Sequence, residues 1–278
     1  MCFGTVAYNN PTDIASWVNH IRALPGGESV HIAVSDNSTD STLADEIKNI
    51  IHDASASYYG DGVNSGYFSG LNKILTNNPG FYFYILGNSD LSYCENFIAS
   101  LYGLGRLRWD IIAPRILTDT GRDLNPYMLE QEREVERWLL RAKFSSYPLY
   151  LCYAIFYRLG FIPFFEHICH HRPVVSRGSR QEIWAAHGSC FVIGQSYLSK
   201  CKELPVRTFL WLEENVLAVY AKINNATIVY YPELLVHHTG RGTTNGMERR
   251  QKYTIKKQSF YSYLAILKEY RDHLKRDS

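Results

Sequence analysis

The chain has 278 residues, of which 46% are hydrophobic and 14% aromatic, and its formal net charge at pH 7 is +2. This length supplies enough apolar material for one large domain with an insertion, and a charge so close to balance argues against nucleic-acid binding. The six cysteines are scattered without a CxxC pair, which argues against a disulfide framework or a zinc ribbon and favours reduced thiols.

The first part of the chain alternates apolar, strand-like runs with polar turns and amphipathic helical segments. Such alternation predicts an α/β fold with a Rossmann-like, mostly parallel central sheet flanked by helices, whose functional loops gather at one edge. The first strand begins almost at residue 1 and leaves no room for a cleaved signal peptide, so we expect a cytoplasmic protein. The predicted strands are Cys2–Tyr8, Val30–Val34, Ala54–Tyr59, Phe81–Leu86 and Asp110–Ala113.

The fourth predicted strand, Phe81–Leu86, runs directly into an acidic turn at Gly87–Asp90. Ligands of open α/β sheets bind outside the carboxyl ends of the strands, so a carboxylate at Asp90 can reach a substrate or a metal ion. A plain Asn-Ser-Asp turn that caps the next helix explains the same residues. The turn by itself leaves both interpretations open.

Residues 122–180 break the alternation, and we expect a helical, aromatic-rich insertion there. The apolar segment Tyr147–Phe165 approaches the length of a membrane span, but its arginine and two prolines fit an interfacial segment better. A helical pair folded onto the domain's own core is the alternative. The histidines and cysteine of residues 167–171 lack the spacing and carboxylate partners of an ordered metal site.

After the insertion, Ala185–Ile193 is a predicted strand with small residues at its start, and Thr227–Val236 is the last predicted strand. Between them, the acidic pair Glu213-Glu214 follows aromatic residues and precedes a helix. This pair is either functional or a charge pair favoured by the helix dipole. A basic, amphipathic helix over Ser259–Leu274 closes the chain. Its charged face would either bind phosphate or an anionic membrane, or simply face solvent.

Six short segments carry residue types that recur, in the same order, in one enzyme family. They are Thr5–Asn10, Val34–Asp40, Asn64–Asn72, Gly87–Asp90, Trp211–Glu214 and Pro232–Thr243. Each is weak alone, but together they resemble the family-2 glycosyltransferases of the GT-A fold, especially the rhamnosyltransferase-like members of bacterial surface polysaccharide synthesis. The resemblance covers roughly residues 4–243 and is weakest in the insertion. This chain departs from the family pattern in three places. The Val34–Asp40 turn is one residue shorter, Asn88 replaces an aspartate of the metal turn, although the rhamnosyltransferase-like members often have asparagine there, and Glu214 stands where the family has an aspartate.

The resemblance implies an inverting transfer of a sugar from a nucleotide-diphosphate donor, dTDP-rhamnose or a UDP-sugar. The acceptor is a hydroxyl of a glycan or a lipid-linked oligosaccharide. A diphosphate leaving group calls for a divalent ion, and oxygen ligands suit Mg²⁺ or Mn²⁺. We choose Asp90 as the first metal ligand and His238 as the second, with Asn88 as a supporting donor. Attack by the acceptor hydroxyl requires a base on the opposite face of the sugar, and Glu214 aligns with the family's base.

The remaining site residues follow from the same resemblance. The nucleotide is assigned to Tyr8, Asn9, Asp36, Asn64, Gly66, Asn72 and Asn88, and the acceptor side to His187, Gly188, Ser189, Trp211 and Glu213. The chain then divides into a nucleotide-sugar-binding α/β half (1–121), the helical insertion (122–180), the acceptor and catalytic half (181–246) and the basic C-terminal helix (247–278).

Two other functions remain open at this point. A non-catalytic GT-A-like protein, acting as a carbohydrate-binding or membrane-associated subunit, would keep Asp36 but would not need Glu214. A nucleotidyltransferase has a similar sheet, but the turn Asn9–Thr12 lacks the glycines and basic residues of a triphosphate cradle. The insertion and basic helix also allow a peripheral contact with the inner face of the plasma membrane, and a homo-oligomer is compatible with the sequence.

Overall fold

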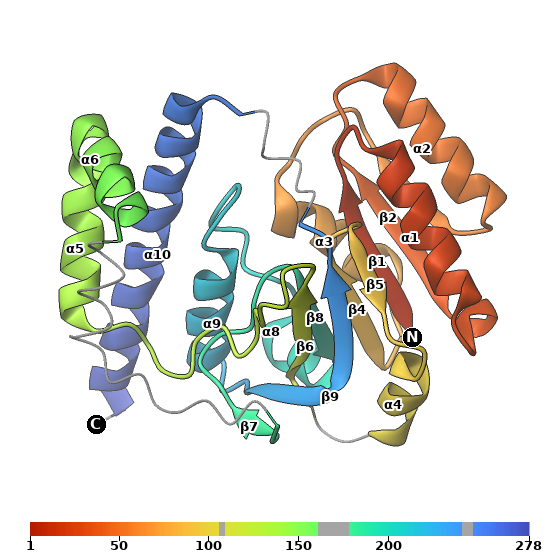
Figure 1. Cartoon of the computed structure of the whole chain (residues 1–278). Helices are drawn as coiled ribbons and strands as arrows, with labels where there is room; N and C mark the ends of the chain where they lie inside the picture. Colours follow the sequence, from red (N-terminus) through yellow and green to blue (C-terminus); the bar gives the residue numbers. More distant parts are fainter. Residues whose placement is uncertain (106–108, 161–177, 241–246, 278) are drawn as a thin grey trace.

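The structure is a computed structural model that describes residues 1–105, 109–160, 178–240 and 247–277. Within these ranges, nine strands form one twisted sheet with helices against both faces (Figure 1). The strands are β1 (Cys2–Ala7), β2 (His31–Asp36), β3 (Ser57–Gly60), β4 (Phe83–Gly87), β5 (Leu91–Tyr93), β6 (Ile111–Thr118), β7 (Gln181–Glu182), β8 (Cys190–Gly194) and β9 (Ile228–His238).

The strand order is β3-β2-β1-β4-β8-β6-β9-β5, and β7 pairs with Val229 and Tyr230 near the start of β9. Strands β3, β2, β1 and β4 are parallel, as the alternating sequence pattern predicts. Strand β8 runs antiparallel between β4 and β6, while β6 and β9 are parallel to each other. Six of the nine strands in the described ranges therefore share one direction, which confirms the expected mostly parallel α/β sheet.

The helices make two apolar layers, one on each face of the sheet. The layer built from α1, α2 and α4 contains the apolar face predicted for the first helix, including Ile14, Trp17 and Ile21. Full burial of one such side chain contributes about 1.5–3 kcal/mol. The opposite layer is built mainly from α3, α8 and α9. These helices are α1 (Pro11–Ala23), α2 (Ser41–Asp53), α3 (Tyr67–Asn77), α4 (Phe97–Gly103), α8 (Gln195–Cys201) and α9 (Glu213–Ile223), with a 3-10 turn η1 (Gly27–Ser29).

Three helices, α5 (Glu134–Ser145), α6 (Tyr147–Arg158) and α10 (Arg249–Asp277), stand together at one end of the molecule, with α9 between them and the sheet (Figure 1). Tilted and edge-on aromatic rings join them, such as Phe144 to Phe260 at 5.2 Å and Tyr147 to Tyr253 at 5.3 Å between centroids. The described helix of the predicted apolar segment, α6, thus pairs with α5 and packs against α10.

The outer side of this pair remains apolar and exposed, with Trp138 at 65% and Phe156 at 51% exposure. Among the described residues, none of the helices is both long and apolar enough to cross a bilayer. The expected tail helix is longer than predicted, since α10 starts at Arg249 and runs to Asp277. Residues 161–165 of the apolar segment and the histidine cluster at 167–171 lie outside the described residues.

Several predicted boundaries shift because backbone pairing, rather than apolarity, decides where a strand ends. Strand β2 continues through Asp36, which pairs with Ala7 on one side and with Gly60 on the other. Strand β6 continues to Thr118 by pairing with β9 beyond a bulge. Strand β8 begins at Cys190, so the small residues before it form a turn. The short strand β5 lies antiparallel to β9 and was not predicted.

Candidate active site

Asp36 ends β2 at the carboxyl edge of the sheet, and only 2% of the residue is exposed. One carboxylate oxygen, Oδ1, accepts a hydrogen bond from the backbone N–H of Ser38 at 2.8 Å. The other, Oδ2, accepts from the hydroxyl of Tyr58 on β3 at 2.8 Å. Each carboxylate oxygen can accept two hydrogen bonds, so Asp36 is held in place and keeps acceptor capacity for a nucleoside.

The loop after β1 is tied to the loop after β2 through Asn9, which adopts a left-handed backbone with φ of 52°. Its N–H donates to Ser38 Oγ at 2.8 Å, and its side-chain oxygen accepts from the N–H of Asp40 at 3.4 Å. The N–H of Tyr8 donates to Asn10 Oδ1 at 2.9 Å. The two turns assigned to the nucleoside therefore form one connected surface.

The third loop enters α3 through Asn64 and Gly66. Asn64 Oδ1 accepts from the N–H of Gly66 at 3.1 Å, and the carbonyl of Gly66 accepts from Asn37 Nδ2 at 3.0 Å. Gly66 has φ of 89°, and a Cβ there would lie 2.8 Å from the carbonyl oxygen of Phe209. Only glycine satisfies both constraints, so this position fixes the loop against the segment that leads to α9.

Asn72 is not brought into this cluster, although the sequence assigns it to the nucleotide. Its Nδ2 donates to the carbonyl of Leu204 at 2.9 Å, and its Oδ1 accepts from the N–H of Leu204 at 2.9 Å. Both ends of the buried carboxamide are thereby occupied by one backbone residue. The geometry gives Asn72 a structural role, which is to hold the loop after α8 onto α3.

The acidic turn after β4 meets the end of β9. His238 Nε2 lies 3.2 Å from Asp90 Oδ1 and 3.4 Å from Asn88 Nδ2. Strand β5 produces this contact, because its first residue, Leu91, pairs with His238. The side chains of Asp90 and His238 are only 6% and 14% exposed. The residues proposed as metal ligands are therefore adjacent, and a short strand that the sequence did not reveal joins them.

The donor set at this turn suits a divalent ion held jointly with a diphosphate. Among the described residues, no group of three or more His, Cys, Asp and Glu side chains could hold a metal by itself. Mg²⁺ is commonly bound through one or two carboxylates and completes its shell with substrate phosphate oxygens and water. Asp90 fits that pattern, with the His238 imidazole and the Asn88 carboxamide as neighbouring donors.

The acidic pair opens α9 after two consecutive left-handed residues, Trp211 with φ of 67° and Leu212 with φ of 65°. Such backbone is sparsely populated for side chains of this size, and each instance costs about 1–3 kcal/mol. Glu213 is 4% exposed, and burial followed by the charge of Glu214 raises its pKa to about 8. Within the described part of the chain, Glu213 Oε1 has no hydrogen-bond partner. Glu213 is thus a buried, protonated acid at neutral pH.

Glu214 points to the turn before β8. A Cβ added at Gly188 would lie 3.3 Å from Glu214 Oε2, so the absence of a side chain at Gly188 gives this carboxylate its place. Burial raises the pKa of Glu214, and a hydrogen bond from Tyr127 opposes that rise. A carboxylate with a raised pKa is suited to accept a proton.

Tyr67, the first residue of α3, links the two acidic centres. Its hydroxyl donates to the carbonyl of Gly188 at 3.1 Å. Its pKa is raised mainly by burial and further by the neighbouring acidic groups, among them Asp90 and Glu214. One phenol therefore lies within electrostatic reach of both the proposed metal turn and the acidic pair.

His187 lies in the turn before β8, together with Gly188, and its imidazole is neutral. Its Nδ1 accepts from the N–H of Ser189 at 3.2 Å and contacts Ser189 Oγ at 2.8 Å, which assigns the ring proton to Nε2. Burial, followed by the positive charges of His238 and Arg122, lowers its pKa to about 4. The Tyr127 ring packs edge-on against it at 5.5 Å. The backbone carbonyl of Ser189 accepts from the N–H of Asn88 at 2.9 Å, which joins this turn to the acidic turn after β4.

Trp211 is placed differently from the other acceptor residues, since the ammonium of Lys256 on α10 lies over its ring at 4.8 Å. Two tyrosines that contact the site were missed by the sequence interpretation. Tyr67 lies within Asn64–Asn72, one of the six segments that resemble the family, so its position in the sequence could have identified it as a site residue. Tyr127 comes from the insertion, where no motif marks it.

Comparison with known proteins bears on the fold of this chain. No family model matches the chain, and no curated protein matches it. The solved structure of GalNAc-T7 with UDP, GalNAc and Mn²⁺ is similar at a TM-score of 0.64 and 11% identity, over 98% of this chain and 49% of that one. TarS of S. aureus is similar at a TM-score of 0.52 and 14% identity, over 86% of this chain and 36% of TarS.

A third structure, residues 1–349 of S. aureus TarS in complex with UDP-GlcNAc, is similar at a TM-score of 0.52 and 13% identity, over 91% of this chain and 62% of that one. This chain therefore spans less than two thirds of the length of each of these three solved chains. These structures are glycosyltransferases, and the likeness shows that this chain has the GT-A fold.

Proposed function

We propose that this chain is an inverting, metal-assisted glycosyltransferase. The observation that carries the proposal is that the turn before β8 joins two centres. The carbonyl of Ser189 accepts from the N–H of Asn88 at 2.9 Å, next to the Asp90–His238 pair, and Gly188 lies against the Glu214 carboxylate. A metal turn at one side and a base at the other is the arrangement that sugar transfer from a nucleotide diphosphate requires. The GT-A fold supports the same reaction class.

The donor binds across the first three loops, with Asp36 and the Tyr8–Asn9 turn at the nucleoside and Asn64, Gly66 and Asn88 along the nucleotide. Asp90 and His238 would hold Mg²⁺ or Mn²⁺, which neutralises the charge that develops on the diphosphate. Two of the neighbouring structures contain UDP or UDP-GlcNAc, which favours a UDP-sugar over dTDP-rhamnose.

The acceptor hydroxyl lies between Glu214 and the anomeric carbon of the donor. Its oxygen forms the new bond to that carbon as the bond from the carbon to the diphosphate oxygen breaks, and the hydroxyl proton passes to the Glu214 carboxylate. Attack opposite the leaving group inverts the anomeric centre. Protonated Glu213 and neutral His187 add no charge beside Glu214, so they shape the acceptor side without competing for the proton.

The acceptor is a hydroxyl of a glycan or a lipid-linked oligosaccharide, and a lipid-linked acceptor brings the protein to the inner face of the plasma membrane. Exposed apolar side chains on the outer side of the α5–α6 pair, such as Trp138 and Phe156, supply an interfacial surface. The start of α10 supplies positive charge at Arg249, Arg250 and Lys252. Apolar area and positive charge together can anchor a protein peripherally.

A thermal-shift panel of UDP, dTDP, GDP and CDP, each with and without Mn²⁺, tests the donor assignment. A nucleotide at 100 times its Kd stabilises the native state by about 2.7 kcal/mol, which is readily seen as a shift in Tm. We expect at least one nucleotide, UDP first, to raise the Tm, and Mn²⁺ to enlarge the shift. The absence of any nucleotide-dependent shift would contradict the proposed function.

A further inference from the structure

The strand that brings Asp90 next to His238 lies at the edge of the sheet. Among the described strands, β5 is the last in the order, and β9 is its one neighbour. The carbonyl of Asp90 accepts from the N–H of Thr239 at 3.2 Å, and the N–H of Cys94 donates to a carbonyl of β9 at 3.1 Å. Alternate residues of an antiparallel strand turn their backbone groups to the same side. Tyr93 therefore turns its N–H and C=O away from β9, toward the open edge.

One histidine of α1, which lies alongside β5, covers this edge (Figure 1). The N–H of Tyr93 donates to His20 Nε2 at 2.7 Å, and the same nitrogen lies 3.1 Å from the carbonyl oxygen of Tyr93. The two rings are stacked at 6.2 Å between centroids. Burial lowers the pKa of His20, so the ring is neutral at pH 7. The short contact to an N–H assigns the ring proton to Nδ1 and makes Nε2 the acceptor.

The start of the same helix holds the other side of the metal turn. Asn10 directly precedes α1, and its Nδ2 donates to Ser89 Oγ at 2.9 Å. Ser89 is only 8% exposed, so little water competes for this contact. The other end of the carboxamide, Asn10 Oδ1, accepts from the N–H of Tyr8 at 2.9 Å. One side chain at the start of α1 therefore connects the nucleoside turn with the metal turn.

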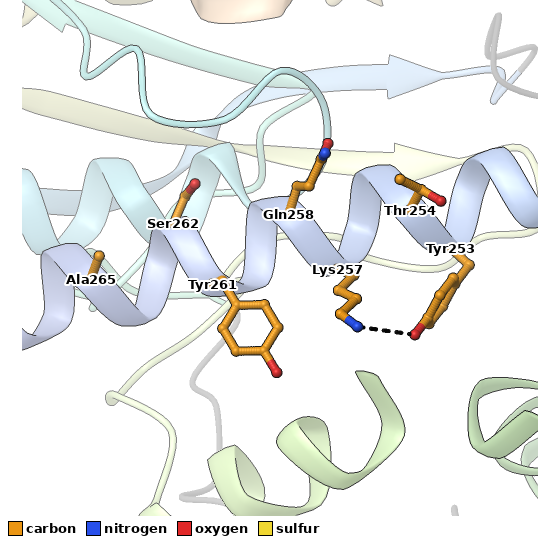
Figure 2. A pocket seen from close by; sticks show the side chains of 7 residues that line it. All are labelled: Tyr253, Thr254, Lys257, Gln258, Tyr261, Ser262 and Ala265. Atoms are coloured by element: carbon orange, nitrogen blue, oxygen red, sulfur yellow. Dashed lines mark hydrogen bonds between the residues drawn. The ribbon is translucent and has the colours of Figure 1, made fainter. Parts of the chain in front are cut away.

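The two contacts bracket Asp90 and match in length. The helix advances about 15 Å from Asn10 to His20. The chain from Ser89 to Tyr93 spans up to about 13 Å when extended. Helix and strand therefore run side by side in the same direction, with one hydrogen bond near each end of α1. The helix α10, whose face toward α5 and α6 is drawn in Figure 2, belongs to the opposite apolar layer, so it does not share this task.

We propose that α1 holds the metal turn in its ligating geometry, with His20 and Asn10 as positioning residues that fix Asp90 beside His238. This inference rests on the proposed function, because the turn is taken to hold a divalent ion. A ligand that is fixed before the ion arrives loses less conformational freedom on binding. His20 acts through the backbone of Tyr93, so its loss weakens metal binding and leaves the binding of nucleotide without metal unchanged.

The test compares His20→Ala and His20→Gln with the wild type, and Asn19→Ala, an exposed neighbour on α1, is the control. Mn²⁺ binding is followed by electron paramagnetic resonance in the presence of UDP or dTDP, and nucleotide affinity without metal by calorimetry. We expect His20→Ala to bind Mn²⁺ about tenfold more weakly, with unchanged affinity for nucleotide alone. In His20→Gln, Oε1 takes the place of Nε2 and accepts the Tyr93 N–H, so this variant and the control should match the wild type.

Hydrogen exchange without any ligand tests the same contact locally, and residues 89–93 should exchange faster in His20→Ala than in the wild type. Unchanged exchange there would overturn the inference. So would Mn²⁺ binding by His20→Ala equal to that of the wild type, or binding by His20→Gln as weak as by His20→Ala, since the hydrogen bond would then not be the cause. Those results leave the proposed function standing. A wild type that binds no Mn²⁺ with either nucleotide would defeat the proposed function and this inference together.

Discussion

The pH dependence of stability offers a direct test of the acidic pair. In the folded chain Glu213 is buried and its pKa is raised to about 8 from 4.5. The folded state therefore holds this proton more tightly than the unfolded state between those values. The resulting stabilisation is fully present below pH 4.5 and is lost as the pH rises through 8. Proton linkage predicts that the contribution of Glu213 to the free energy of unfolding falls by about 4 kcal/mol between pH 5 and pH 9.

Glu213→Gln removes the titration but keeps the size and hydrogen-bonding capacity of the side chain. Urea unfolding of the wild type and the variant from pH 5 to pH 9 gives a difference in unfolding free energy at each pH, in which the titrating groups that do not interact with Glu213 cancel. We expect the wild type to lose about 4 kcal/mol relative to the variant across this range. Glu46→Gln, an exposed position on α2, serves as the control and should show no such trend.

A difference that stays flat from pH 5 to pH 9 would refute this reasoning, because it would mean that Glu213 is already ionised in the folded chain. The acceptor side of the cleft would then carry two adjacent negative charges. A difference of opposite sign would mean that an undescribed cation pairs with Glu213.

Three further results are expected. Asp90→Ala should lose the metal-dependent part of nucleotide affinity in calorimetry, while Asp53→Ala, an exposed carboxylate at the end of α2, should keep it; equal metal dependence in both would count against Asp90 as a ligand. Gly188→Ala places a Cβ 3.3 Å from Glu214 Oε2, so kcat should fall about ten- to a hundredfold with nucleotide affinity preserved, and an unchanged kcat would contradict the assigned geometry. At low salt, more of the wild type than of Trp138→Glu should co-sediment with anionic vesicles. A wild type that does not co-sediment would contradict the proposed membrane-binding surface.

The local parts of the fold could be predicted from the sequence because their signals are local. Apolar periodicity predicted β1 to β4 and the helices between them, and Pro11 and Asp40 mark two helix starts through local chemistry. The non-local parts could not be predicted in this way. Strand β5 has three residues and exists because β9 pairs with it. The insertion of β8 between β4 and β6 is likewise a property of the assembled sheet.

The same distinction between local and non-local signals applies to the candidate site. The family-like segments supplied the turns that carry Asp36, Asp90 and Glu214, and the structure places these turns along one edge of the sheet. The partners of those residues come from distant segments without a motif, as with Tyr127 beside Glu214. Asn72 is the opposite case, because it occupies a motif position but serves packing. Only its two hydrogen bonds to Leu204 in the structure reveal this role.

The central claim is that Glu214 is the base of an inverting transfer, and single-turnover kinetics of Glu214→Gln tests it most directly. The donor is the sugar nucleotide identified by the thermal-shift panel, and the anomeric configuration of the product is read by NMR. The account predicts a rate lowered by roughly 10²–10⁴-fold, nucleotide affinity close to that of the wild type, a milder effect of Glu213→Gln, and an inverted product. A Glu214→Gln rate close to that of the wild type, or a product with retained configuration, would contradict it.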